Sequence, residues 1–237
     1  MIPLLVLAAD PTDGDLLARI SQHLDRGGVL GYPTETVYGL GAQATEQGVK
    51  TLRELKGRDE GKPFLVLLPA SDAGVGEGAS RKAPSWGAEG IVGDEQGLVW
   101  TPSARRLADA FWPGPLTLVL SDPDGYFPSG VRSTAGTVGV RVSPHPFVTA
   151  LLGVMERPLL STSANRPGRE PARTANEVGE AVQGRPGIDR LWIADGGPLP
   201  NVGISTVVDC TELRPRVLRA GVVSEEEIAR VLAETHG

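Results

Sequence analysis

Short β-rich runs alternate with helical patterns along almost the whole chain, and this alternation constrains the fold more than any other feature. No break in composition divides the elements into two groups. The pattern therefore predicts a single α/β domain over residues 1–237, with helices covering at least one face of its sheet. Strands are predicted at residues 4–8, 29–33, 64–68, 116–121, 138–142, 159–161, 191–194, 206–209 and 217–219, and helices at 13–26, 46–56, 103–111, 146–152, 174–182 and from Ser224 onward.

One stretch, residues 71–97, interrupts the alternation. It is rich in Gly, Ala, Ser and charged residues, shows no sustained periodicity and is longer than ordinary connections between elements. We therefore predict a mobile surface loop. A functional lid and a neutral insertion share this composition, and the insertion is the favoured interpretation.

The charge of the chain limits the partners that it can attract. Its 23 basic and 29 acidic residues give a net charge of −6 and a pI of about 5.2. The chain as a whole therefore does not attract the phosphate backbone of a nucleic acid. Any contact with a nucleotide or a nucleic acid must come from a local cluster of cations.

The sequence has few residues that could bind a metal or form a disulfide, and it shows no signal peptide or membrane span. Cys210 is the only cysteine, and His23, His145 and His236 lack a metal-ligand spacing. The N-terminal apolar run meets Asp10 too soon for a signal peptide, and nowhere do ~18 apolar residues occur together as a membrane span requires. We expect a cytoplasmic protein in a reducing compartment, with no metal held by the protein and no membrane partner.

The first candidate site is GYPTETVYGLG at residues 31–41, after a predicted strand. Glycines and hydroxyls at a strand end expose N–H groups and oxygens where α/β proteins bind ligands. An ordinary turn, in which Thr34 and Thr36 bond only to the backbone, explains the same residues. Residues 39–44 also fit the dinucleotide pattern GxGxx(G/A), but no predicted strand leads directly into them, so a Rossmann site is not predicted.

The second candidate site is KGRDEGKP at residues 56–63, which has three cations between a helix end and a buried strand. A Walker A loop is excluded, because three residues rather than four separate the glycines and Pro63 replaces the hydroxyl residue that would hold Mg²⁺. What remains is an anion clamp made by Lys56 and Arg58. A basic helix end that complements the helix dipole explains the spacing equally well.

The third candidate site is LLSTSAN at residues 159–165, where a predicted buried strand ends in three hydroxyls and an amide. These groups can hydrogen-bond a ribose, a phosphate or an amino-acid carboxylate. A strand cap with an Asx turn has the same composition. No GxSxG sequence surrounds a serine, and no serine is recognisably paired with a histidine and an acid, so hydrolysis by a nucleophilic serine is not predicted.

Seven short motifs occur in a fixed order along the chain. They are YPTETVYGLGA (32–42), LKGRDEGKP (55–63), FWPGPLTLVL (111–120), VGVRVSPHP (138–146), STSAN (161–165), ISTVVD (204–209) and VLRAG (217–221). Together they resemble the YrdC family, the threonylcarbamoyl-adenylate synthases, over nearly the whole length. An ordered set of this size is far more specific than any single motif.

The resemblance implies a YrdC-like fold, a twisted open mixed sheet with helices packed on it, and a large concave pocket. It implies that L-threonine, bicarbonate and ATP are joined into L-threonylcarbamoyl-AMP with release of pyrophosphate. ATP is then a substrate that brings Mg²⁺ with it. The product serves to make N6-threonylcarbamoyladenosine (t6A) in tRNA, through a partner protein that transfers the threonylcarbamoyl group.

The resemblance also implies the residues of the site. Lys56 and Arg58 are expected to be catalytic, because positioning and charge stabilisation dominate the catalysis of attack on phosphorus. The ATP contacts are expected to be Arg58, Lys62, Ser163, Asn165 and Arg219. The threonine contacts are expected to be Thr34, Thr117, Arg141, Ser161 and Ser205.

The chain departs from the family pattern at two positions. Leu67 and Lys62 stand where some long-form relatives place a histidine and an asparagine, so the threonine contacts are expected to differ in detail. The chain resembles the short, single-domain form of the family.

Two other functions are consistent with the resemblance. One is an RNA-binding module without this activity, as in the YciO branch, and the net charge of −6 argues against strong RNA binding. The other is carbamoyl transfer, as in hydrogenase-maturation proteins with a YrdC-like domain. Those proteins carry zinc-finger-like cysteine motifs, and this chain has one cysteine.

Overall fold

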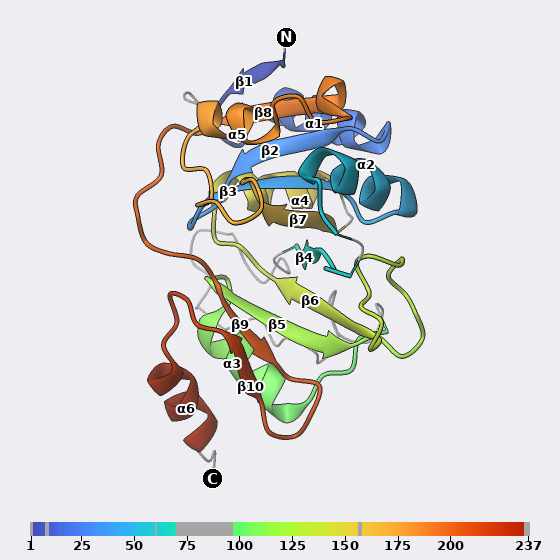
Figure 1. Cartoon of the computed structure of the whole chain (residues 1–237). Coiled ribbons are helices and arrows are strands. Elements are labelled where there is room, and N and C mark those ends of the chain that lie inside the picture. Colours follow the sequence, from blue (N-terminus) through green and yellow to red (C-terminus); the bar gives the residue numbers. More distant parts are fainter. Residues whose placement is uncertain (1, 8–9, 60, 70–96, 156–157, 235–237) are drawn as a thin grey trace.

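A mixed sheet extends through the length of the molecule (Figure 1). The computed structural model describes residues 2–7, 10–59, 61–69, 97–155 and 158–234. Within these residues ten strands form one sheet in the order β1-β8-β2-β3-β7-β4-β6-β5-β9-β10. Strand β8 is parallel to both of its neighbours, whereas β3 is antiparallel to both of its own. The predicted open mixed sheet of an α/β domain is confirmed.

The predicted helices and all but one of the strands agree with the structure to within a few residues. The strands are β1 (Leu4–Val6), β2 (Val29–Pro33), β3 (Tyr38–Gln43), β4 (Leu65–Leu67), β5 (Leu116–Ser121), β6 (Thr137–Arg141), β7 (Leu159–Ser163), β8 (Leu191–Asp195), β9 (Thr206–Asp209) and β10 (Arg216–Arg219). The helices are α1 (Gly14–Asp25), α2 (Glu46–Lys56), α3 (Pro102–Phe111), α4 (Pro146–Met155), α5 (Ala175–Val182), the short 3₁₀ helix η1 (Ile188–Arg190) and α6 (Glu225–Ala233).

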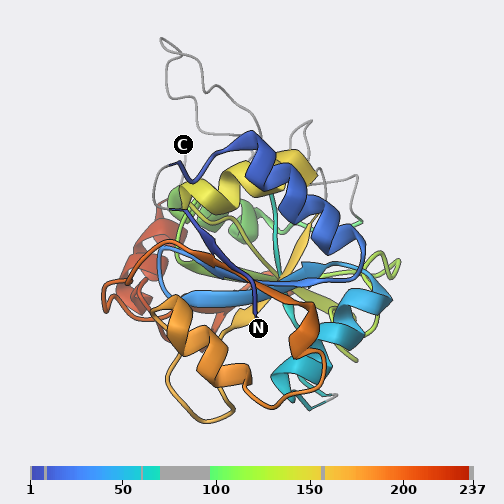
Figure 2. The same cartoon turned by 90° about the horizontal axis from the view of Figure 1, so that it is seen from above.

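Helices cover both faces of the sheet, as the view from above shows (Figure 2). Helices α1 and α4 pack together on one face, where Ile20 and Leu24 meet Phe147. Helices α2 and α5 lie on the other face and bury Leu52 and Val178. Each fully buried side chain of this kind stabilises the fold by about 1.5–3 kcal/mol. The third pair, α3 and α6, packs together near β5.

Strand β3 is the element that the sequence interpretation missed. The residues after the strand predicted at 29–33, up to Gly41, were expected to be turn-rich, but the turn between β2 and β3 is confined to residues 34–37. Gly39 and Gly41 lie inside the strand, opposite β2. A Cβ atom at Gly39 would lie 3.1 Å from the ring of Tyr32, and one at Gly41 would lie 2.8 Å from it. These glycines therefore make room for a tyrosine ring rather than forming a turn.

The connection from β8 to β9, residues 196–205, passes six intervening strands in the sheet order and follows the left side of the molecule in Figure 1. Two of the hydrogen bonds that hold it lie near its start. The hydroxyl of Tyr38 donates to the carbonyl oxygen of Gly197 over 2.8 Å, and the N–H of Leu199 donates to the carbonyl oxygen of Arg173 over 2.9 Å. This course brings residues 201–205 to the open side of the sheet's middle strands, where the candidate site lies.

Two further predictions concern the loop at residues 71–97 and the absence of a membrane span. The predicted loop at residues 71–97 lies, except for Gly97, outside the described residues. Among the described helices none is both long and apolar enough to cross a membrane.

Candidate functional site

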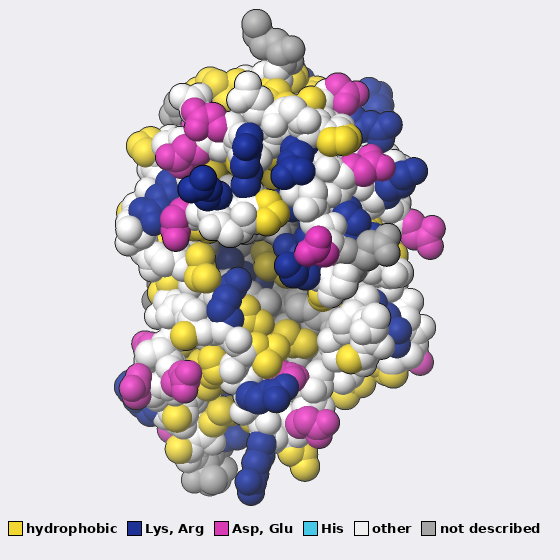
Figure 3. Space-filling view, viewed as in Figure 1, with side chains coloured by type: hydrophobic (Ala, Val, Ile, Leu, Met, Phe, Trp, Pro, Cys, Tyr) yellow, Lys and Arg dark blue, Asp and Glu magenta, His cyan; other side chains and the backbone are white. Residues whose placement is uncertain are grey.

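A cavity of about 760 Å³ lies at the middle of the sheet, and Figure 3 shows the hollow with lysine and arginine side chains around its mouth. Strands β3 to β7, β9 and β10 contribute to its wall, together with the segments that follow β2, α2 and β7 and the segment that precedes β9. The structure brings nine of the eleven predicted site residues to this one cavity. They are Thr34, Arg58, Thr117, Arg141, Ser161, Ser163, Asn165, Ser205 and Arg219.

Arg58 lies just beyond the end of α2, which Gly57 terminates in the left-handed conformation with φ of 60°. Its guanidinium donates to the carbonyl oxygens of Lys62 and Pro63 over 3.0 and 2.9 Å and to the hydroxyl of Thr162 over 3.2 Å. It also lies over the ring of Phe64, 5.2 Å from the ring centre. Burial lowers the pKa of Arg58, but an arginine keeps its charge. The result is a fixed cation at the cavity wall.

The two lysines of the KGRDEGKP motif, Lys56 of the predicted anion clamp and Lys62, do not line the cavity. The ammonium of Lys56 is buried and donates to the carbonyl oxygen of Ser163 over 2.6 Å, and to both the main-chain and the side-chain oxygens of Asn165. Burial, together with Arg58 and Arg185, lowers the pKa of Lys56 to about 7. Lys56 thus ties the end of α2 to the end of β7.

Lys62 lies on the surface. Its side chain is 66% exposed, and its ammonium pairs with Asp59 over 3.2 Å. An exposed pair of this kind contributes little to stability. The structure therefore places Lys62 at the outside of the loop that carries Arg58.

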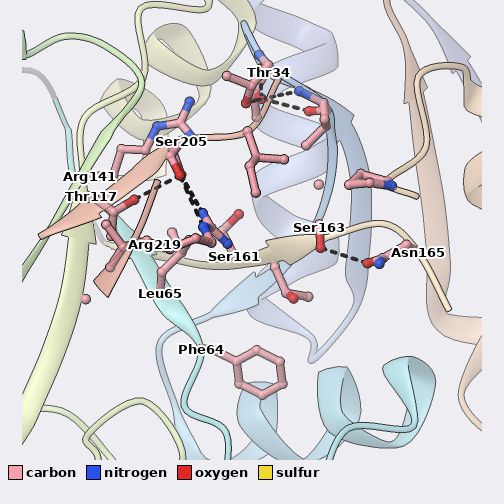
Figure 4. A pocket seen from close by; sticks show the side chains of 18 of the residues that line it. Thr34, Phe64, Leu65, Thr117, Arg141, Ser161, Ser163, Asn165, Ser205 and Arg219 are labelled. Carbon is pink, nitrogen blue, oxygen red and sulfur yellow. Dashed lines mark hydrogen bonds between the residues drawn. The ribbon is translucent and has the colours of Figure 1, made fainter. Parts of the chain in front are cut away.

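The end of β7 presents hydroxyl and amide groups to the cavity (Figure 4). The hydroxyl of Ser163 donates to the side-chain oxygen of Asn165 over 2.7 Å, and the amide nitrogen of Asn165 donates to the carbonyl oxygen of Arg169 over 2.6 Å. Lys56 holds the same segment from behind. These bonds connect the end of β7 to the end of α2 and to the backbone at Arg169.

The opposite wall comes from β5, β9 and β10. There Ser205 meets Thr117 with 3.2 Å between the two hydroxyl oxygens, and Arg219 donates to the carbonyl oxygen of Ser205 over 2.7 Å and to its hydroxyl over 3.1 Å (Figure 4). Residues expected to contact ATP and residues expected to contact threonine are therefore direct neighbours here.

The hydroxyl of Thr34 is occupied by the turn that it forms. It donates to the carbonyl oxygen of Val37 over 2.7 Å and accepts from the N–H groups of Thr36 and Val37, each over 3.2 Å. As in the ordinary-turn interpretation, the hydroxyl proton of Thr34 is used in a bond to the backbone. The side chain nevertheless lines the cavity.

Arg141 ends β6 and is already partnered. Its side chain is 6% exposed, and it pairs with Glu35, whose other carboxylate oxygen accepts from the hydroxyl of Ser143 over 2.7 Å. Its Nε donates to the carbonyl oxygen of Gly114 over 3.2 Å. Burial lowers the pKa of Arg141 to about 10, so the cation persists at neutral pH. A guanidinium has five N–H groups, so about three remain for a ligand.

Leu67, where the chain departs from the family pattern, lies opposite Arg141 in the register of β4 and β6. Its side chain is 1% exposed and belongs to the core between the sheet and helices α1 and α4. The neighbouring Leu65 lines the cavity.

The sequence interpretation missed four charged residues of the site, namely Glu35, Arg169, Glu170 and Arg173. Glu35 stands in the first motif, and its partner Arg141 is far away in the sequence, so no spacing connects the two. Arg169 and Arg173 line the cavity from the segment after β7. The signal that could have found them is the density of arginine directly after STSAN, where residues 166, 169 and 173 are all arginine.

The cavity is strongly positive although the chain is acidic. Five arginines and one glutamate, Glu170, line it. Within the described part of the chain, no group of three or more His, Cys, Asp or Glu side chains could hold a metal ion. The site is therefore built to receive an anion with several oxygens, alongside a ligand that hydroxyl groups recognise.

Sequence comparison gives two findings. A family model for the Sua5, YciO and YrdC proteins, described as "Telomere recombination", matches residues 22–221. The threonylcarbamoyl-AMP synthase of Bacillus subtilis (strain 168) is 34% identical over 230 residues, which are 95% of this chain and 59% of that protein.

Structure comparison points the same way. Pyrococcus abyssi Sua5 complexed with L-threonine has a TM-score of 0.76 and 30% identity to this chain, covering 99% of this chain and 61% of that one. E. coli YciO has a TM-score of 0.75 at 23% identity, covering 96% and 100%, and so shares the fold. This chain thus spans about three fifths of the Bacillus and Pyrococcus proteins.

Proposed function

The chain belongs to the Sua5/YciO/YrdC family, and on this premise we propose that it is a threonylcarbamoyl-AMP synthase. The substrates are L-threonine, bicarbonate and ATP, and the products are L-threonylcarbamoyl-AMP, pyrophosphate and water. The product then supplies t6A formation in tRNA through a separate transferase protein. We place this reaction in the cytoplasm, where ATP and tRNA are available.

One observation carries the proposal. A single cavity has buried hydroxyls next to arginines, and the two sets meet at Ser205 and Arg219. An amino acid with a hydroxyl and a carboxylate suits the first set, and a nucleoside triphosphate suits the second. A reaction that joins the two needs both ligands within reach of each other.

The proposed chemistry needs no nucleophile from the protein. The amine of threonine and bicarbonate condense to a carbamate with loss of one water, and an oxygen of the carbamate attacks the α-phosphorus of ATP. The bond from that phosphorus to the bridging oxygen of the β-phosphate then breaks, and pyrophosphate leaves with the electron pair. Mg²⁺, which arrives with ATP, and fixed cations stabilise the charge that develops on the phosphate oxygens.

We assign the roles by position. Arg58, Arg219, Ser163 and Asn165 contact ATP, whereas Lys56 acts indirectly by holding Ser163 and Asn165 in place. Lys62, on the surface, remains a predicted contact for the outer phosphates. The threonine contacts are Thr34, Thr117, Arg141, Ser161 and Ser205.

The test is pyrophosphate release by the purified protein. With ATP and bicarbonate present, the rate should depend on L-threonine, and chromatography should show a new adenylate in equal amount. Valine, which lacks the hydroxyl, serves as the control amino acid. Release that ignores threonine would show that the assignment is wrong.

An RNA titration tests the non-catalytic alternative. A protein that binds the RNA backbone through ~6–10 phosphate contacts loses roughly 10³–10⁵ in affinity between 50 and 200 mM salt. Tight RNA binding with this salt dependence, together with ATP turnover that ignores threonine, would favour the RNA-binding module.

A further inference from the structure

Tyr32 reaches the candidate site from two strands away. It lies on β2 and is fully buried, yet its hydroxyl donates to the hydroxyl oxygen of Ser161 on β7 over 2.6 Å. Strand β3 lies between β2 and β7. Residues paired in antiparallel strands share one face of the sheet, so Tyr32, Gly39, Gly41 and Ser161 share a face.

The glycines of β3 are what allow this contact. Neighbouring strands lie about 4.8 Å apart, so a side chain on β2 must pass over β3 to meet β7. A Cβ atom at Gly39 would lie 3.2 Å from the Tyr32 hydroxyl and 3.4 Å from that of Ser161. Because Gly39 and Gly41 have no side chains, the ring of Tyr32 has room to pass over β3.

The direction of this hydrogen bond constrains the Ser161 hydroxyl. A phenol is the more acidic of the two hydroxyls and therefore the better donor. Burial raises the pKa of Tyr32, so the phenol keeps its proton at neutral pH. Since the phenol fills one acceptor site of Ser161, the proton of Ser161 must point elsewhere. Within the described part of the chain Tyr32 is the only hydrogen-bond partner of that hydroxyl.

We propose that Tyr32 is a positioning residue that aims the Ser161 hydroxyl proton into the cavity, toward an anionic oxygen of the amino-acid substrate. Ser161 lines the cavity, as does Arg141. The acceptor is the substrate's carboxylate, which Ser161 and Arg141 would bind together. This inference rests on the proposed function, because it names the threonine-side ligand of that reaction.

The test is Tyr32→Phe, which removes one oxygen and keeps the ring in its place over β3. The KM for threonine should rise about fivefold, because the proton of Ser161 becomes free to rotate, whereas the KM for ATP should change less than twofold. The matched control is Tyr38→Phe, whose hydroxyl bonds to Gly196 and Gly197 and does not line the cavity. It should lower the melting temperature and leave the KM for threonine unchanged.

A double mutant separates positioning from general damage. Ser161→Ala should raise the KM for threonine, and adding Tyr32→Phe to it should have no further effect, because the group that Tyr32 positions is gone. The inference would be overturned if the two substitutions raised the threonine KM independently, so that their fold-changes multiplied in the double mutant. An unchanged threonine KM in Tyr32→Phe would overturn it as well. In both cases threonine-dependent activity of the wild type would still support the proposed function. If wild type releases no pyrophosphate with threonine, the proposed function fails first.

If the Tyr32→Phe protein does not fold, a second variant tests the same proposal. Gly39→Ala would press on the hydroxyl pair with its new methyl group, and its threonine KM should rise while its ATP KM stays constant. Equal changes in both constants would contradict the proposal.

Discussion

Replacing Arg141 by lysine tests the threonine side of the cavity most directly. The change keeps a positive charge opposite Glu35 and removes the planar fork. Alanine would be a poorer choice, because it leaves the largely buried carboxylate of Glu35 without its cation. Losing one partner of such a buried pair costs about 3–5 kcal/mol of folding free energy.

The magnitude follows from counting donors. Arg141 donates to Gly114 and to Glu35, which leaves about three of its five N–H groups for two parallel bonds to a carboxylate. A lysine has three donors on one atom, so it cannot serve Glu35 and both carboxylate oxygens in that geometry. Losing about 1.4 kcal/mol of binding corresponds to about a tenfold rise in the KM for threonine.

The assay measures initial rates of pyrophosphate release at varied threonine with ATP and bicarbonate saturating, and then at varied ATP. The threonine KM should rise tenfold or more, and the ATP KM should change little. Arg132→Lys is the matched control, since Arg132 pairs with the buried Asp122 and does not line the cavity. An unchanged threonine KM would refute the role of Arg141, and a matching rise in the ATP KM would assign it to phosphate instead.

Two further predictions concern the cations near β7. Arg58→Ala should lower kcat about 10²-fold, as expected when a transition-state charge partner is lost, with a melting temperature close to wild type. Full activity regained on cooling an unstable variant would show that Arg58 is structural. Because burial lowers the pKa of Lys56 from 10.5 to about 7, unfolding takes up a proton between these values, and the Lys56 contribution makes the free energy of unfolding rise with pH there. Lys56→Met should flatten that rise in urea titrations, and parallel pH curves for the two proteins would contradict the assignment.

The sequence predicted nearly every element of the fold, because helix caps and apolar periodicity are local signals. The helix predicted from Ser224 onward begins with a capping box made by Ser224 and Glu227, and Gly57 ends α2 directly after the helix predicted at 46–56. Strand β3 was not predicted, because its glycines are required by the ring of Tyr32 on the neighbouring strand and not by a turn. A glycine that makes room for a distant ring has the same local appearance as a glycine in a turn.

The site was predicted through motifs, and its internal contacts were not. Each motif supplies residues of the right chemistry, but motif order does not say which cation meets which oxygen. The ammonium of Lys56 was therefore expected at a ligand, and the fold directs it to Ser163 and Asn165. In the same way, the pairing of Arg141 with Glu35 joins residues that only the sheet brings together.

The cations that line the cavity are arginines rather than lysines because they must stay charged while partly buried. The chain has only four lysines among its 23 basic residues, and all five cations that line the cavity are arginines. Burial, together with Arg58 and Arg185, lowers the pKa of Lys56 to about 7, so this lysine is only partly charged at neutral pH. Arg141, which is at least as buried as Lys56, keeps a pKa of about 10 and stays charged. A cavity that must bind anions while partly shielded from water can therefore rely on guanidinium groups, whereas the buried side chain of Lys56 links α2 to β7 by hydrogen bonds.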